Sequence, residues 1–246
     1  MIRFIDEEGL ITPRGEFFDC DIKADIAITT FSVFILDTLL KYTGAKQTGV
    51  MRGSVDIPLY TFDNNGKTTV VYLTPVGAPA AVSALEEILA GGVKQVIAFG
   101  ICGALTEASP HLFVVPTRAY RDEGTSYHYM PATEYVEIKN AKKVQSVLEG
   151  AGISTLVGGV WTTDGFYRET RTRLNEMREA GCVAVDMESA ALQACSDFRG
   201  TEFYTFFITA DSLAGEEWEP NTILDLKATD STHVAVAAAV RLASEI

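Results

Sequence analysis

The chain has 246 residues, of which 47% are hydrophobic and 22% charged, and its formal net charge is −13. This composition is typical of a folded globular protein, and the acidic balance argues against nucleic acid or an anionic membrane as a partner, since both need a basic surface. A small anionic substrate is compatible with it, because a few backbone amides can bind one locally. No linker or repeat divides the chain, and we expect one domain over residues 1–246.

The cysteines and the N-terminal segment indicate the compartment. None of the four cysteines forms a CxxC pair, so we expect reduced thiols rather than a zinc ribbon or a thioredoxin-like motif. The first segment, MIRFIDEEGL, lacks the apolar core of a signal peptide, and no apolar run reaches the length of a membrane span. We therefore expect a cytoplasmic protein. The three histidines are too irregularly spaced for a metal site, and we expect neither a metal nor another cofactor.

Apolar strand-like runs alternate with helix-like segments along the chain. In chain order we predict a strand over 24–30, a helix over 31–42, a strand over 68–76, a helix over 79–92, strands over 94–100 and 111–120, a helix over 141–152, a strand over 154–164, a helix over 172–181, a strand over 182–187, a helix over 188–200, a strand over 201–213 and a helix over 231–246. Asn140 is expected to cap the helix that follows it. The alternation predicts an α/β fold, a single-domain three-layer sandwich in which helices flank a mixed, mostly parallel central sheet.

Four segments follow predicted strands at the edge of the sheet where such folds bind ligands, the carboxyl ends of the strands. They are FGICGAL, TTDGFY, VDMES and ITADSL. In the first, Gly100 and Gly103 permit a sharp turn or a close approach of the backbone to a ligand, although their GxxG spacing is not that of a dinucleotide site. In the last, a partly desolvated Asp211 suits general acid catalysis, and an ordinary Asx turn is the alternative.

Two acids flank a methionine in the stretch AVDMESAALQAC. If residues 182–187 form a strand, side chains two positions apart point to the same side, and Asp186 and Glu188 share one face. The alternatives are that Glu188 is a first-turn acid complementing the dipole of the next helix and that Met187 fills the core. Phe166 is either a flat wall for a ring or a core residue.

The segment RAYRDEGTSYHY is dense in polar and aromatic side chains. Arg118, Arg121, His128 and Tyr129 either reach a ligand or a second subunit, or belong to a solvated loop with internal ion pairs. The residues of this segment alone do not decide between these possibilities.

Six segments in this order resemble the nucleoside phosphorylase-I family, which includes purine nucleoside phosphorylases, uridine phosphorylases and related nucleosidases. They are VGAPAA, FGICGAL, RDEGTSYHY, TTDGFY, VDMESAAL and ITADSL, and they span about residues 76–213. The resemblance implies one domain of this family and cleavage of the N-glycosidic bond of a nucleoside with phosphate, giving a free base and ribose 1-phosphate. It also implies a homo-oligomer, either a dimer or a hexamer built as a trimer of dimers, with a neighbour completing the site.

The resemblance also implies roles for individual residues. Glu188 accepts hydrogen bonds from the ribose 2′- and 3′-hydroxyls, and Met187 packs on the sugar. Asp211 is the catalytic acid at purine N7, and because uridine phosphorylases resemble Asn-Arg at this place, the aspartate favours a purine. The implied base pocket is lined by Phe166, Cys102, Gly103, Val185 and Asp186. The candidates for the phosphate loop are Gly100, Ile101 and Arg121, and His128 is a candidate for a contact with the second subunit.

The sequence departs from the phosphorylase pattern where arginines would hold phosphate. The loop after the first strand reads ITTFSVF instead of Gly-Asp-Pro-x-Arg, Ala98 stands before the glycine loop, and PLYTFDNNGK contains no arginine. Arg52, Arg118 and Arg121 are possible substitutes. FYRETRTR lacks the Gln-x-Arg that reads uracil, and the loop SLAGEEWEPN lacks an arginine to assist the aspartate.

These departures leave two alternatives to a phosphorylase. A phosphate dianion without cationic partners binds poorly in an acidic protein. The first alternative is therefore a nucleosidase that uses water, and the second is a nucleoside-binding protein without catalytic activity.

Overall fold

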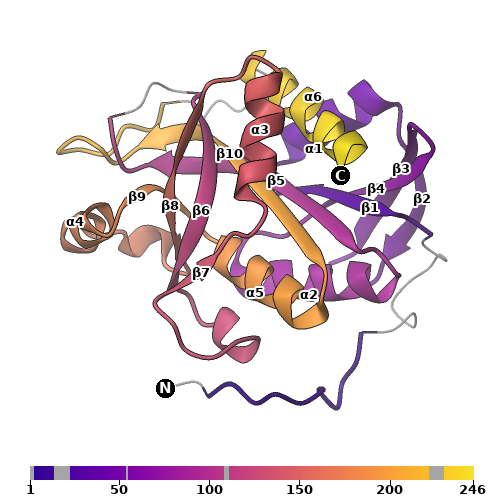
Figure 1. The fold of residues 1–246 in the computed structure, drawn as a ribbon, viewed down its shortest axis with the longest axis horizontal. Helices are drawn as coiled ribbons and strands as arrows, with labels where there is room; N and C mark the ends of the chain where they lie inside the picture. Colours follow the sequence, from indigo (N-terminus) through magenta and orange to yellow (C-terminus); the bar gives the residue numbers. More distant parts are fainter. Residues whose placement is uncertain (1–2, 14–22, 54, 108–110, 222–229) are drawn as a thin grey trace.

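The computed structural model describes residues 3–13, 23–53, 55–107, 111–221 and 230–246. Its elements in chain order are β1 (Ile26–Thr30), α1 (Val33–Thr43), β2 (Lys46–Met51), β3 (Ile57–Asn64), β4 (Lys67–Leu73), α2 (Ala78–Ala90), β5 (Gln95–Ala104), β6 (Phe113–Asp122), the 3-10 helix η1 (Ser126–His128), β7 (Tyr135–Glu137), α3 (Ala141–Gly150), β8 (Thr155–Thr163), the 3-10 helix η2 (Phe166–Arg168), α4 (Arg171–Glu179), β9 (Cys182–Asp186), α5 (Ser189–Arg199), β10 (Glu202–Ser212) and α6 (Asp230–Glu245) (Figure 1).

The described strands form one ten-stranded sheet in the order β10-β6-β8-β9-β5-β1-β4-β3-β2, with β7 paired to β6. Strand β10 also pairs with β5, so that β5, β10, β6, β8 and β9 close into a ring. The longest pairings, β10 with β5 and β6 with β8, are parallel, whereas β2, β3 and β4 pair in antiparallel fashion. The prediction of a mixed sheet is confirmed.

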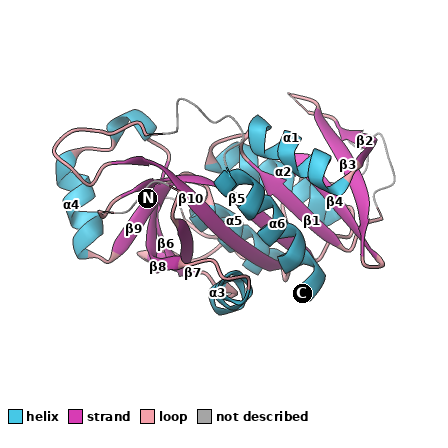
Figure 2. Cartoon of the chain, turned by 90° about the horizontal axis from the view of Figure 1, so that it is seen from above, coloured by secondary structure: helices cyan, strands magenta, loops and turns pink. Residues whose placement is uncertain are grey.

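Helices cover both faces of this sheet (Figures 1 and 2). Helices α1, α3 and α6 pack on one face through an apolar cluster that includes Leu39, Val144 and Val236. Helices α2 and α5 cover the other face with side chains such as Leu85 and Leu192. Because removing this apolar surface from water is the main favourable term in folding, the three layers hold together, as predicted. No helix in the described part of the chain is both long and apolar enough to cross a bilayer.

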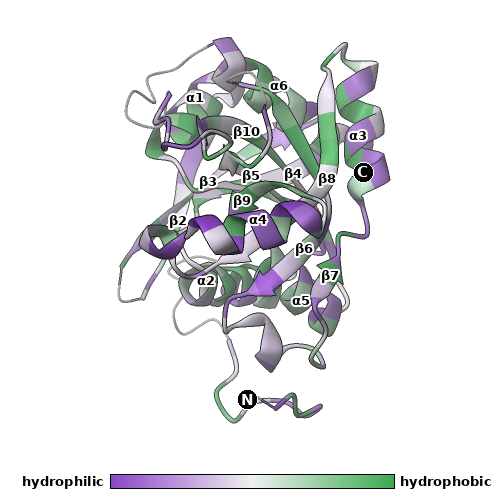
Figure 3. Ribbon diagram, turned by 90° about the vertical axis from the view of Figure 1, so that its left-hand side faces the viewer, coloured by the Kyte–Doolittle hydropathy of each residue, from purple (hydrophilic) through white to green (hydrophobic). Residues whose placement is uncertain are grey.

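Helix α4 lies outside these layers, across β9 at one end of the molecule (Figure 3). It is mostly hydrophilic, and its buried residues Leu174 and Met177 pack in a small third cluster with Trp161 and Val185. The chain reaches α4 from β8 and leaves it into β9. This helix therefore stands beside the strand ends that carry the candidate site.

Two expectations about local structure were wrong. Strands β2, β3 and β7 were not predicted: β2, KQTGVM, is a polar strand at the edge of the sheet in which Met51 is the buried residue, and β7 has only three residues. Asn140 occupies the N-cap position of α3, but its side chain makes no cap hydrogen bond. Its Nδ2 instead donates a hydrogen bond to the carbonyl oxygen of Phe203 at 3.1 Å, which ties α3 to β10.

Candidate active site

A cavity of about 590 Å³ opens where β1, β9 and β10 end and along the last residues of β5. It is lined by Phe31, Ser32, Val33, Phe34, Val76, Ile101, Cys102, Gly103, Phe166, Glu169, Val185, Asp186, Met187, Glu188 and Asp211. The structure thus brings together most of the residues that the sequence suggested for sugar, base and catalysis.

Glu188 is a buried acid at the turn between β9 and α5. Its Oε1 accepts a hydrogen bond from the backbone N–H of Gly77 at 2.6 Å. Gly77 has a positive φ of 98°, which a glycine adopts readily, and it stands directly before α2. Burial, with the charge of Asp186 second, raises the pKa of Glu188 to about 8. A carboxyl held in this way at the cavity wall is suited to binding hydroxyl groups.

The expected reason for pairing Asp186 with Glu188 was wrong. Strand β9 ends at Asp186, and Glu188 is already the N-cap residue of α5, so the two acids do not share a strand face. Asp186 Oδ2 accepts hydrogen bonds from the backbone N–H groups of Glu188 at 3.3 Å and Ser189 at 2.7 Å. Its Oδ1 accepts one from Thr162 Oγ1 at 2.7 Å. Asp186 lines the cavity, but its oxygens are engaged in fixing the turn that presents Met187 and Glu188.

Asp211 lies near the end of β10, where the register with β5 shifts. Its side chain is buried, and Trp218 Nε1 donates a hydrogen bond to its Oδ2 at 2.7 Å. Its Oδ1 faces Gly103, where an added Cβ would lie 3.3 Å from that oxygen and 2.9 Å from both Leu213 and Val185 side-chain carbons. Burial raises the pKa of Asp211, and the Trp218 hydrogen bond partly offsets the shift.

The remaining walls of the cavity are largely apolar. Phe31, Val33, Phe34 and Val76 come from the loop after β1 and from the segment before α2, and Phe166 comes from η2. Phe34 is 49% and Phe166 38% exposed, so both are accessible at the mouth. Flat and aliphatic surfaces of this kind suit the faces of a base and a sugar.

Residues 25–245 match the model of the phosphorylase superfamily. The chain belongs to the phosphorylase superfamily.

Two members with known names show moderate likeness. A DeoD-type purine nucleoside phosphorylase from Alkaliphilus metalliredigens is 30% identical over 162 residues, which are 63% of this chain and 68% of that protein. A guanosine phosphorylase from Halorubrum lacusprofundi is 29% identical over 140 residues, 55% of this chain and 58% of that protein. Among solved structures, AMP nucleosidase from Bacteroides thetaiotaomicron matches with a TM-score of 0.72 at 16% identity, covering 90% of this chain and 88% of that one. That last likeness supports the fold.

The three arginines that were considered as replacements for the family's phosphate-binding arginines lie outside the cavity lining. Arg121 is buried, and its guanidinium donates hydrogen bonds to Ser126, Pro131 and Thr133 and lies 3.9 Å from the ring centre of Tyr127. It does not line the cavity, so its candidacy for phosphate is not supported by the structure.

The other two substitutes are also engaged outside the cavity. Arg118 donates a hydrogen bond to the carbonyl oxygen of Ala180, and Arg52 forms an ion pair with Asp56. Among the described residues that line the cavity, none is arginine, lysine or histidine, and four are acids.

Gly100 and His128 are the other predicted residues outside the cavity lining. An added Cβ on Gly100 would lie 3.0 Å from the Phe31 ring, so this glycine makes room for an aromatic wall. His128 is exposed at the end of η1, and its contact with a second subunit stays a prediction.

Sequence reasoning missed two residues that complete the site. Trp218 lies in the acidic loop SLAGEEWEPN, and only a tryptophan among acids distinguished it. Glu169 lies between η2 and α4 and lines the cavity. Burial, with the charge of Asp211 second, raises its pKa to about 7. The arginine-rich segment FYRETRTR drew attention to its cations, whereas its one acid lines the cavity together with Phe166 and none of its arginines does.

Proposed function

We propose that this protein cleaves the N-glycosidic bond of a purine ribonucleoside and transfers the ribosyl group to water. The observation that carries the choice of water is the segment Phe31–Phe34. It lines the cavity at the place where the resemblance puts a phosphate-binding arginine, and it supplies two phenylalanines, a serine and a valine. A phosphate dianion there would lie near the cavity's four acids without a lining cation, and its desolvation would not be compensated.

The residues of the cavity support each part of this reaction. Glu188 binds the ribose hydroxyls, Met187 packs on the sugar and Phe166 stacks on the base. As the bond from C1′ to N9 breaks, its electron pair moves to the purine, and protonated Asp211 gives its proton to N7. The oxygen of water bonds to C1′ and releases one proton, which restores the acid. Because the ribosyl group has oxocarbenium character at that point, a weak nucleophile suffices.

A second candidate is phosphorolysis, which would give the base and ribose 1-phosphate. It is favoured by the relatives of this chain, which include purine nucleoside phosphorylases that are 27–30% identical to it. In that case, cations from outside the described cavity lining would have to hold the phosphate.

Product analysis tests the proposal. The purified protein is incubated with inosine, adenosine, guanosine or uridine, with and without phosphate, and the sugar product is identified. We expect free ribose from a purine nucleoside at the same rate in both conditions. If ribose 1-phosphate forms, and only when phosphate is present, the acceptor of the ribosyl group is phosphate and not water. Cleavage of uridine alone would overturn the assignment of Asp211.

The variant Asp211→Asn separates an enzyme from a binding protein. We expect it to lower kcat/KM by about 10²–10⁴-fold, the usual contribution of a positioned acid, while nucleoside binding stays nearly intact. Glu179→Gln, a change of an exposed acid on α4, serves as the control. Binding of a nucleoside without cleavage by the wild-type protein would indicate the non-catalytic alternative.

A further inference from the structure

Glu169 is a cavity acid for which the proposed reaction has no use. Its carboxyl group is partly buried and lines the cavity with Phe166 and Asp211. Among the described residues, no hydrogen bond or ion pair engages this carboxyl. A carboxyl at the cavity wall that no protein donor engages is available to accept a hydrogen bond from a bound ligand. We therefore ask which part of a ligand could donate to it.

The position of Glu169 places that donor on the base and not on the sugar. Glu169 follows Phe166 by three residues, across η2, and it lies close enough to Asp211 for the charge of that residue to act on it. In the proposed reaction Phe166 stacks on the purine and Asp211 donates its proton to N7. The exocyclic group nearest to N7 is the substituent on C6. If Asp211 faces N7, Glu169 beside it faces this substituent.

Two neighbouring carboxyl groups do not both ionise readily, so the pair tends to hold one proton. Such a pair offers one donor and one acceptor. The charge of Asp211 favours the proton on Glu169 before a ligand binds. A 6-aminopurine presents an acceptor at N7 and a donor at the amino group, so its binding favours the arrangement with the proton on Asp211 and Glu169 as the acceptor. A 6-oxopurine presents acceptors at both N7 and O6, and an ionised Glu169 would face the oxygen without a proton between them.

We propose that Glu169 is a specificity-determining residue that accepts a hydrogen bond from the exocyclic amino group of the base, so that the site prefers 6-aminopurine to 6-oxopurine ribonucleosides. This inference rests on the proposed function of the same cavity.

The test measures equilibrium binding and kcat/KM for adenosine and inosine at neutral pH, with wild-type protein, Glu169→Gln and the control Glu179→Gln. We expect a wild-type preference for adenosine of about tenfold or more, the size of one charge-assisted hydrogen bond. Glutamine can donate to O6 as well as accept from the amino group, so Glu169→Gln should reduce the preference to near unity. Glu179→Gln should keep it.

The outcomes separate this inference from the proposed function. A wild-type protein that binds both nucleosides equally, or inosine more tightly, overturns the role of Glu169, as does a preference that Glu169→Gln leaves unchanged. Binding that discriminates without any cleavage would refute the proposed reaction and leave the role of Glu169 supported. Because the Glu169 carboxyl has no partner in the described residues, the glutamine variant is expected to fold, and its melting temperature checks this.

Discussion

The indole of Trp218 and the carboxyl of Asp211 form the hydrogen bond that sets the state of the proposed acid. The bond occupies Oδ2 at 2.7 Å and leaves Oδ1 beside Gly103, toward the cavity. It also counteracts the effect of burial on the pKa of Asp211. In the proposed reaction, Trp218, which was not predicted from the sequence, thus influences both which oxygen of Asp211 faces the purine and the pH range in which Asp211 carries a proton.

Trp218→Phe should shift the pH dependence of cleavage. Removing the donor takes away the larger of the two hydrogen bonds that oppose the effect of burial, so the pKa of Asp211 rises further. Because the protonated form is the active one, activity is lost as pH rises through this pKa, and the loss should move to higher pH in the variant. The profile of kcat/KM against pH measures the shift. Trp161→Phe removes a similar indole hydrogen bond, to Asp122 and away from the cavity, and an equal shift in that control would contradict the role of Trp218.

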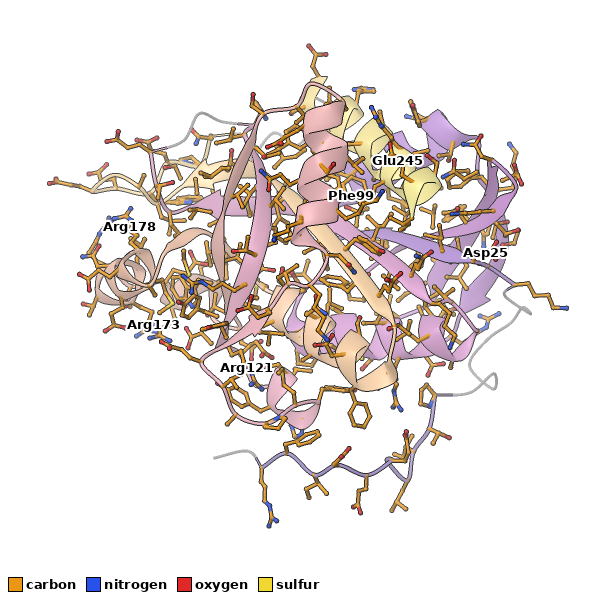
Figure 4. The ribbon with its side chains drawn as sticks, in the orientation of Figure 1. Asp25, Phe99, Arg121, Arg173, Arg178 and Glu245 are labelled. Atoms are coloured by element: carbon orange, nitrogen blue, oxygen red, sulfur yellow. The ribbon has the colours of Figure 1, made fainter. Side chains whose placement is uncertain are left out.

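At the scale of the elements, helix α4 fixes the loop that carries Trp218. Arg178 donates hydrogen bonds to the carbonyl oxygens of Leu105, Leu213 and Ala214, so one side chain joins the loop after β5 to the loop after β10. Figure 4 places Arg178 and Arg173 on this helix. Helix α4 therefore positions Asp211 indirectly, by fixing the backbone of the loop that contains Trp218.

Arg178→Ala should reproduce part of the effect of Trp218→Phe. With the loop less constrained, the indole hydrogen bond is formed less of the time, and the pH limit of activity should move in the same direction by a smaller amount. The double variant should show no further shift beyond Trp218→Phe, because both changes act on one interaction. Arg173→Ala, on the same helix but paired with Asp122 and Glu176, is the matched control. Additive shifts in the double variant would show that Arg178 acts by another route.

Elements with strong patterns could be predicted from the sequence, whereas the hydrogen bonds that shape the turn at the site could not. The apolar strand before Asp211 and the proline-opened helix α2 were predicted and are present. The strand was predicted to end at Met187 and the next helix to begin at Glu188, each within one residue of the observed ends of β9 and α5. What ends β9 is the side chain of Asp186 capping the next backbone amides, a competition between side chain and ladder that periodicity does not reveal.

At the scale of the whole molecule, the cavity joins segments that lie far apart in the chain. Phe31, Glu169 and Asp211 come from the loop after β1, the approach to α4 and the end of β10. The family resemblance supplied the residues inside its shared segments, such as Glu188. It supplied nothing for Glu169 or Trp218, since their places are decided by tertiary packing and no local pattern marks them. The arginines that hold phosphate in phosphorylases of this family are absent from the matching places of this chain, and the sequence alone shows this departure.

The free energy of unfolding of the whole chain should depend on pH because Glu188 is buried. Its pKa is raised to about 8 in the folded protein, against an ordinary value near 4.5. A raised pKa means that the folded state binds the extra proton, so the stabilisation is complete below about pH 4.5 and is lost as pH rises through about 8. Glu188→Gln imitates the protonated acid and keeps an oxygen for the Gly77 N–H.

The variant should melt at nearly the wild-type temperature near pH 5 and at a higher temperature than wild type near pH 8, while it loses ribose binding. Thermal unfolding at the two pH values measures this, with Glu179→Gln as the exposed control. A difference in melting temperature that is the same at both pH values would show that Glu188 is not protonated in the folded protein, and the cavity would then carry a permanent negative charge against which phosphate binding is still less favourable.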